Sequence, residues 1–273
     1  MALSSSSAAA VWTACKGWAA SVAAAAGELI FPAACGVCGK PLNGPETESH
    51  AGKPPWADRL CRPCESELFD PSPRCSQCGL PGRGGADCGG CRRLAARLRL
   101  TRPPWQQLAV LGRYDGLLRE AVLQAKRPAG EDLAELLGQL LAYRRPEIGS
   151  WDVAAVVPIP MHWRRRWLRG TNAAAVLAGQ LARQLGVPRR NGLVRTSLTP
   201  LQRSLPAESR PANVATNFRL GDRRIRGRPV LLVDDVATTG ATLAAATKLL
   251  LEAGVPLVYA AVAARAEAVT EAA

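Results

Sequence analysis

The segment from Val230 to Thr242 (V-L-L-V-D-D-V-A-T-T-G-A-T) constrains the fold of this chain more than any other segment. Its apolar run ends in two adjacent carboxylates, and a turn rich in threonine and glycine leads into a helical pattern over Leu243 to Glu252. An apolar run that ends in charge is typical of a buried parallel strand whose carboxyl end opens into a site. We therefore expect an α/β protein with a Rossmann-like parallel sheet.

The loop after this strand, residues 237–242, brings several backbone N–H groups and three hydroxyls to a helix N-terminus. Such a loop suits a phosphate monoester. Asp234 and Asp235 repel phosphate, so they are better suited to accept hydrogen bonds from vicinal sugar hydroxyls or to lie near a metal ion. Together these groups predict a site for a ribose 5-phosphate.

Two other interpretations of this segment compete with that prediction. The first is a buried strand followed by an ordinary polar turn. The second is the Walker-B strand of a nucleotide hydrolase, which also ends in two aspartates. A hydrolase of that kind needs a phosphate loop of the form G-x-x-x-x-G-K-[ST], and the sequence contains no such string.

Eight of the nine cysteines form four C-x-x-C pairs, which indicates metal binding in a reducing compartment rather than disulfides. Four thiolates for each tetrahedral ion would make two structural zinc sites. Sequential pairing along the chain is one arrangement, and the spacing does not exclude an interleaved one. A redox or iron–sulfur role is the competing interpretation. The expected ligands are Cys35, Cys38, Cys61, Cys64, Cys75, Cys78, Cys88 and Cys91.

The cysteine-rich segment contains many glycines and prolines and few large apolar residues, so bound metal would have to supply its folding energy. The whole chain of 273 residues carries a net charge of +13. Two four-thiolate zinc sites would lower that charge to about +9. The remaining positive charge fits a polyanionic partner, either nucleic acid or a phosphorylated substrate, although an arginine-rich chain can also reflect genomic base composition.

No run of 18 or more apolar residues occurs, so we expect no membrane span and a cytoplasmic location. Residues 1–30 are alanine-rich but lack the basic start of a signal peptide, and we interpret them as an N-terminal tail with a weak helix. Residues 31–100 then form a zinc-binding unit and residues 105–265 an α/β domain. Residues 266–273 are the C-terminal tail, and we expect the chain to be frayed from Arg265 on.

Hydrophobic periodicity predicts the other elements of the chain. Strands are expected at 108–114, 151–160 and 255–263, in addition to the motif strand at 229–234. Helices are expected at 91–100, 115–127, 131–143 and 172–185. Residues 195–220 show no clean period, and we interpret them as an ordered loop that closes over the site as a lid.

Two basic segments are candidate anion contacts. The loop at 161–170 contains four arginines and two tryptophans and leaves the strand at 151–160, which suits a pyrophosphate leaving group. Its interleaved Trp and Arg residues also suit stacking on single-stranded nucleic acid, and a solvated basic loop is the simplest alternative. Lys126 and Arg127 end a helix, where they either contact an anion or cap the helix dipole.

Several motifs taken together resemble the ComF family over about residues 30–265. They are the cysteine pairs, Y-D-G-L-L-R followed by Lys126, a P-I-P loop that ends in R-G-x-N, and D-D-V-A-T-T-G. A further set consists of Thr199, Gln202, Leu205, Arg210, Asn213 and Phe218. The resemblance implies a type I phosphoribosyltransferase fold behind an N-terminal double zinc ribbon. It also implies Mg²⁺-dependent binding of phosphoribosyl pyrophosphate (PRPP).

The resemblance assigns roles to residues of this sequence. Asp234 and Asp235 are the expected catalytic residues and hold the ribose hydroxyls. The remaining PRPP-binding residues are Ala237, Thr238, Thr239, Gly240, Ala241 and Thr242. The expected pyrophosphate loop contributes Arg164, Arg169, Gly170 and Asn172. Thr171 and Ala173 depart from the R-G-F-N-Q pattern usual in the family, which removes a glutamine contact.

Two functions follow from the resemblance. One is a phosphoribosyltransferase, a glycosyltransferase that moves a pentosyl group to an acceptor that the sequence does not name. The other is a non-catalytic nucleic-acid-binding module that uses PRPP or a nucleotide as a regulatory ligand. The family is linked to natural competence, DNA uptake and single-stranded DNA, so a DNA-uptake helicase or a recombination protein is an expected partner.

Overall fold

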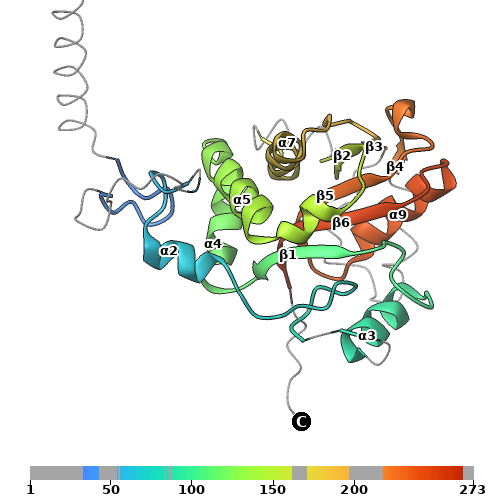
Figure 1. Ribbon diagram of the computed structural model, residues 1–273, viewed down its shortest axis with the longest axis horizontal. Helices are drawn as coiled ribbons and strands as arrows, with labels where there is room; N and C mark the ends of the chain where they lie inside the picture. Colours follow the sequence, from blue (N-terminus) through green and yellow to red (C-terminus); the bar gives the residue numbers. More distant parts are fainter. Residues whose placement is uncertain are drawn as a thin grey trace, which may run out of the picture. The chain divides into compact units, whose positions relative to one another are not determined.

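The computed structural model describes residues 33–42, 54, 56–82, 84–85, 88–161, 171–196 and 218–266. Contacts along the chain divide it into two units, Met1–Cys61 and Arg62–Ala273. All the helices and strands named below belong to the second unit (Figure 1). The domain boundaries predicted from the sequence remain a proposal.

A four-stranded parallel sheet forms the centre of the second unit, with the strand order β1-β6-β5-β2 (Figure 1). Its strands are β1 (Leu108–Arg113), β2 (Ala155–Pro158), β5 (Val230–Ala237) and β6 (Val258–Arg265). Because all four strands are parallel, their carboxyl ends lie at one edge of the sheet. The predicted α/β class with a parallel sheet is confirmed.

Helices cover both faces of this sheet, as expected for parallel strands. One core contains every second residue of the strands, such as Val230 and Leu232, together with Leu243 and Leu250 of α9 (Ala241–Glu252). The intervening residues therefore face the opposite side, where α4, α5 and α7 contact the strands. These three helices are Gly116–Ala125, Glu131–Arg144 and Ala173–Leu185.

The remaining elements are short and lie around the sheet. A two-stranded antiparallel sheet pairs β3 (Leu193–Arg195) with β4 (Phe218–Leu220). The others are the helices α2 (Arg62–Leu68) and α3 (Gly89–Leu98) and the 3₁₀ helices η1 (Pro146–Ser150) and η3 (Arg223–Ile225). Within the part of the chain that the structure covers, no helix combines the length and hydropathy needed to cross a membrane.

Several element boundaries differ from the sequence prediction, among them the strand expected at 151–160, which is shorter as β2, and three boundaries near the motif. Strand β5 continues past Asp234 to Ala237, because its neighbour β6 pairs with it as far as Ala237 opposite Arg265. Helix α9 begins at Ala241, so Thr242 lies in its first turn. The prediction that the tail frays from Arg265 on is wrong for that residue, which ends β6 and is 4% exposed.

Candidate functional site

The two motif carboxylates lie on the last half of β5, at the carboxyl edge of the sheet. The residues before them are fully buried, whereas Asp234 and Asp235 keep part of their surface exposed. The Asp234 carboxyl accepts a hydrogen bond of 2.9 Å from the backbone N–H of Asp235. Burial of the Asp234 carboxyl, together with the adjacent Asp235 carboxyl, holds the pKa of Asp234 well above its ordinary value.

Lys126 is a third member of this site. It follows α4, and its ammonium lies 3.1 Å from a carboxylate oxygen of Asp235. The side chains are 21% and 17% exposed, so water screens this pair only partly. The sequence left the role of Lys126 open between an anion contact and helix capping, and the structure shows an ion pair with the motif. The pair leaves the edge of the sheet with less negative charge than two free carboxylates would give it.

The loop between β5 and α9 has the form of a phosphate cradle. Thr238 and Thr239 are exposed, and the Thr239 hydroxyl accepts a hydrogen bond of 3.3 Å from the backbone N–H of Ala241. Gly240 is the N-cap of α9 and has a φ of 74°, a left-handed conformation that glycine adopts without strain. After Ala241, the N–H groups of Thr242 and Leu243 in the first turn of α9 have no partner within the helix and are available to an anion.

The predicted pyrophosphate loop is only partly within the described residues. Arg164, Arg169 and Gly170 lie outside them. Asn172 is the N-cap residue of α7, and its side-chain amide donates to the backbone carbonyl of Ile159 at 3.4 Å. The backbone N–H of Ile159 donates in turn to the carbonyl of Val233, directly before the acid pair. The segment that leaves β2 therefore starts beside the motif, as the sequence predicted.

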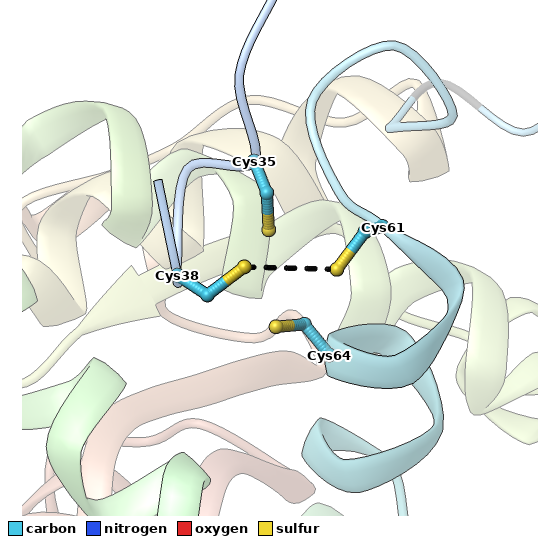
Figure 2. A group of neighbouring side chains, drawn as sticks. All are labelled: Cys35, Cys38, Cys61 and Cys64. Carbon is cyan, nitrogen blue, oxygen red and sulfur yellow. Dashed lines mark hydrogen bonds between the residues drawn. The ribbon is translucent and has the colours of Figure 1, made fainter. Parts of the chain in front are cut away.

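The first cysteine cluster brings together Cys35, Cys38, Cys61 and Cys64 (Figure 2). All four sulfur atoms lie within 4.8 Å of one another, and those of Cys38 and Cys61 are 3.8 Å apart. Burial opposes ionisation of Cys35, but hydrogen bonds from the backbone of Cys38, Cys61 and Val37 outweigh it and lower its pKa to about 6. This thiol is therefore ready to ionise and to bind a cation.

The second cluster consists of Cys75, Cys78, Cys88 and Cys91, again with all sulfur atoms within 4.8 Å. Two sulfur pairs, Cys75 with Cys91 and Cys78 with Cys88, are 3.5 and 3.8 Å apart. Burial raises the pKa of Cys78 to about 11 and also raises that of Cys91. For Cys88, burial is outweighed by hydrogen bonds from the Cys91 backbone and from neighbouring thiols, which lower its pKa to about 7.

Both clusters fit a zinc ion. Tetrahedral zinc with Zn–S bonds of about 2.3 Å separates its sulfur ligands by about 3.8 Å, close to the distances seen here. The first C-x-x-C pair of each cluster is followed by a glycine, and the two glycines adopt the same turn. Gly39 and Gly79 both have a φ of 72°. Each donates its N–H to the carbonyl of the cysteine four residues earlier at 2.8 Å. The structure groups the cysteines sequentially, which decides between the two pairings left open above.

Sequence reasoning missed one buried residue near the cradle. The Arg265 guanidinium donates to the backbone carbonyls of Cys78, Ala237 and Thr238. An arginine at the end of an apolar strand carries no sequence signal for such contacts, because all three partners lie at least 27 residues away in the chain.

The fold and the site define the class of protein. At its carboxyl edge the parallel sheet carries an acid pair, followed by a Thr/Gly loop that leads into a helix N-terminus. This is the arrangement of a type I phosphoribosyltransferase fold. The family model for the phosphoribosyl transferase domain matches residues 171–272.

Similarity to known proteins extends to most of the chain. The DNA utilization protein YhgH of Escherichia coli is 31% identical over 83% of this chain and 94% of its own length. Competence protein F of Haemophilus influenzae is 32% identical over 72% of this chain and 86% of its own length. Competence protein ComFC of Bacillus subtilis is 26% identical over 72% of this chain and 80% of its own. The chain belongs to the ComF/YhgH family.

Proposed function

We propose that this protein binds PRPP together with Mg²⁺ at the carboxyl end of β5, as a phosphoribosyltransferase-like protein that supports DNA uptake. One observation carries the proposal. The two carboxylate acceptors lie at the end of β5, and the loop that follows directly leads into the N-terminus of α9, where backbone N–H groups can bind a phosphate. The acceptors suit the vicinal hydroxyls of a ribose, and the cradle suits its 5-phosphate.

Each part of the site has a role in this proposal. Asp234 and Asp235 accept hydrogen bonds from the ribose hydroxyls, and residues 238–242 bind the 5-phosphate. Arg164 and Arg169 of the loop after β2 stabilise the pyrophosphate. Lys126 balances the negative charge of Asp235 until the sugar arrives, so that an anionic ligand can approach.

The residues at this edge also fit a magnesium ion. Mg²⁺ prefers oxygen ligands and is usually held by one or two carboxylates plus the phosphates of a substrate. Asp234 and Asp235 offer such oxygens beside the expected position of the pyrophosphate. When bound, Mg²⁺ would neutralise charge on the pyrophosphate and make it a better leaving group.

A comparison of three sugars tests the proposed site. Calorimetric titrations use PRPP, ribose 5-phosphate and 2-deoxyribose 5-phosphate, each with Mg²⁺. We expect PRPP to bind most tightly, and the deoxy sugar to bind about tenfold more weakly than ribose 5-phosphate because the acid pair loses one hydroxyl partner. Equal affinity for the two monophosphates would contradict the role of the carboxylates.

An assay of pyrophosphate release distinguishes an enzyme from a binding protein. In a transfer reaction a nucleophile attacks C1 of the ribose, the C1–O bond breaks, and pyrophosphate leaves with its electron pair. Release of pyrophosphate from PRPP in the presence of a panel of nucleobases and amines supports the transferase. PRPP binding without release for any acceptor favours the non-catalytic alternative.

Single-stranded DNA binding is the second candidate function, and one surface favours it. Around β4 and η3, five arginines are exposed: Arg219, Arg223, Arg224, Arg226 and Arg228. The relatives named above as a DNA utilization protein and competence proteins support the same assignment. DNA affinity should fall steeply with salt, with a log–log slope of roughly −0.7 for each phosphate contact. Absence of binding at low salt would exclude this function.

A further inference from the structure

We propose that Arg265 is the positioning residue of the phosphate loop and that it links this loop to the second cysteine cluster. The proposal deepens the PRPP site and rests on it, because it names what holds the cradle in its binding conformation. The link makes the affinity for a phosphorylated sugar depend on the metal occupancy of Cys75, Cys78, Cys88 and Cys91.

The contacts of Arg265 reach both the loop and the cluster. Its Nη1 donates to the carbonyl of Ala237 at 2.7 Å and to that of Thr238. Its Nε donates to the carbonyl of Cys78 at 3.0 Å. The guanidinium is a planar fork with five donors, so one buried side chain serves carbonyls on two separate segments. A lysine in this place would lack the fork.

The hydrogen bond to the Thr238 carbonyl determines which way the peptide groups of the phosphate loop point. A trans peptide group is planar, and its C=O and the following N–H point in opposite directions. Because Arg265 holds the Thr238 carbonyl toward the interior, the N–H of Thr239 points away from the guanidinium. The same argument applies to the Ala237 carbonyl and the N–H of Thr238. Without Arg265 the Ala237 carbonyl still accepts from the backbone N–H of Ala266 at 2.9 Å, but the Thr238 carbonyl loses its guanidinium partner. The Thr238–Thr239 peptide group is then free to turn, and a carbonyl turned outward would repel a phosphate.

Apolar packing joins the same two segments. Helix α3 starts directly after Cys88 and includes Cys91, and its residue Leu94 lies against Gly240 of the loop. A Cβ added to Gly240 would meet Leu94 at 3.1 Å and the Trp105 ring at 3.5 Å. Cys75, Cys78, Leu94 and Trp105 belong to the same buried core as Leu243 of α9. A change at the cluster is therefore transmitted through a continuous, close-packed contact.

The first experiment compares two arginines. Arg265→Met keeps a long apolar stem but removes the guanidinium with its charge and its donors. Arg113→Met is the matched control, because Arg113 ends the neighbouring strand β1 opposite Arg265 in the register and is 52% exposed. Amide hydrogen exchange is measured on the full-length, metal-loaded chain without ligand. We expect exchange at residues 238–242 to be at least tenfold faster in Arg265→Met and unchanged in the control.

The second experiment perturbs the cluster. Cys91→Ser removes one ligand of the second cluster, and Cys38→Ser removes one ligand of the first. We expect faster exchange at 238–242 in Cys91→Ser only. Leu94→Ala leaves all ligands and Arg265 in place, and it should give a smaller increase. Unchanged exchange within β5 and β6 shows that each variant is folded.

PRPP titration of the same variants completes the test. We expect the dissociation constant to rise at least tenfold in Arg265→Met and in Cys91→Ser, and Arg265→Lys to recover only part of the loss. Unchanged loop exchange in Arg265→Met, or an equal effect of Cys38→Ser and Cys91→Ser, would overturn the proposal. If the wild-type chain binds no PRPP, the proposed function fails, whereas the exchange data still decide the role of Arg265.

Discussion

At the scale of single residues, the acid pair and Lys126 determine the charge of the site. Asp234 and Asp235 are neighbours on one strand, and only Asp235 has an ion pair with Lys126. Because burial and the nearby carboxyl raise the pKa of Asp234, its charged form is costly in the ligand-free protein. In the proposed complex a ribose would offer two hydroxyl donors to this pair, and sugar binding would relieve part of that cost.

Asp234→Asn should stabilise the ligand-free protein and weaken sugar binding. An acid whose pKa is higher in the folded state keeps its proton there after the unfolded chain has lost it. The stability of the wild type therefore falls as the pH rises above the usual value of 3.8, until the folded pKa is reached. An amide has no such dependence, so the difference in melting temperature between variant and wild type should widen from pH 5 to pH 8. Parallel curves would contradict the raised pKa.

Lys126→Met should destabilise the fold and weaken PRPP binding, because it leaves the Asp235 carboxylate without its cation. We expect a loss of about 2 kcal/mol in the free energy of unfolding, measured by urea denaturation. Lys248→Met is the matched control, since Lys248 pairs with Glu252 at 3.8 Å on the surface, with both side chains at least 60% exposed. Its effect should stay within about 0.5 kcal/mol. Equal effects would show that the Lys126 pair is an ordinary surface contact.

At the scale of elements, the strand, loop and helix of the motif were predictable because their signals are local. An apolar run, a Thr/Gly turn and a helical period follow one another within residues 230–252. The end of β5 was not predictable, because it depends on pairing with β6 up to Arg265. The same limit applies to Lys126 and Arg265, whose partners are set by the fold rather than by neighbouring residues.

Gly240→Ala tests the geometry of the loop. The variant would have to adopt a φ near 74° and would press its Cβ against Leu94. Gly227→Ala is the control, because Gly227 has a φ of 68° but open space around its Cβ. A left-handed alanine costs about 1 kcal/mol in both, and the contact adds to this cost at Gly240 alone. Urea denaturation should show a larger loss for Gly240→Ala, and PRPP affinity should fall only in that variant. Equal losses of stability in the two variants would show that the contact with Leu94 adds no cost.

At the scale of the whole molecule, the cysteine clusters explain how a segment poor in large apolar residues folds. The sequence predicted eight ligands and two sites but left their pairing open, since spacing does not determine which pairs meet. The structure groups them sequentially. The second cluster also shares a core with the sheet, so a metal ion bound there would contribute to the stability of the larger unit.

Metal analysis of the purified chain should find two zinc ions per chain, measured by mass spectrometry of the elements. Cys38→Ser and Cys91→Ser should each lose one ion, because each leaves one cluster with three thiolates. Chelation of both ions should lower the melting temperature. A single zinc ion, or iron in place of zinc, would contradict two structural zinc sites.

The central claim is that the carboxyl end of β5 binds PRPP through its acid pair. Isothermal titration calorimetry of PRPP, with and without Mg²⁺, on the wild type and on Asp235→Asn tests this claim most directly. We predict Mg²⁺-dependent binding to the wild type and at least tenfold weaker binding to the variant. Equal affinity of the two proteins, or no binding of PRPP to the wild type, would contradict it.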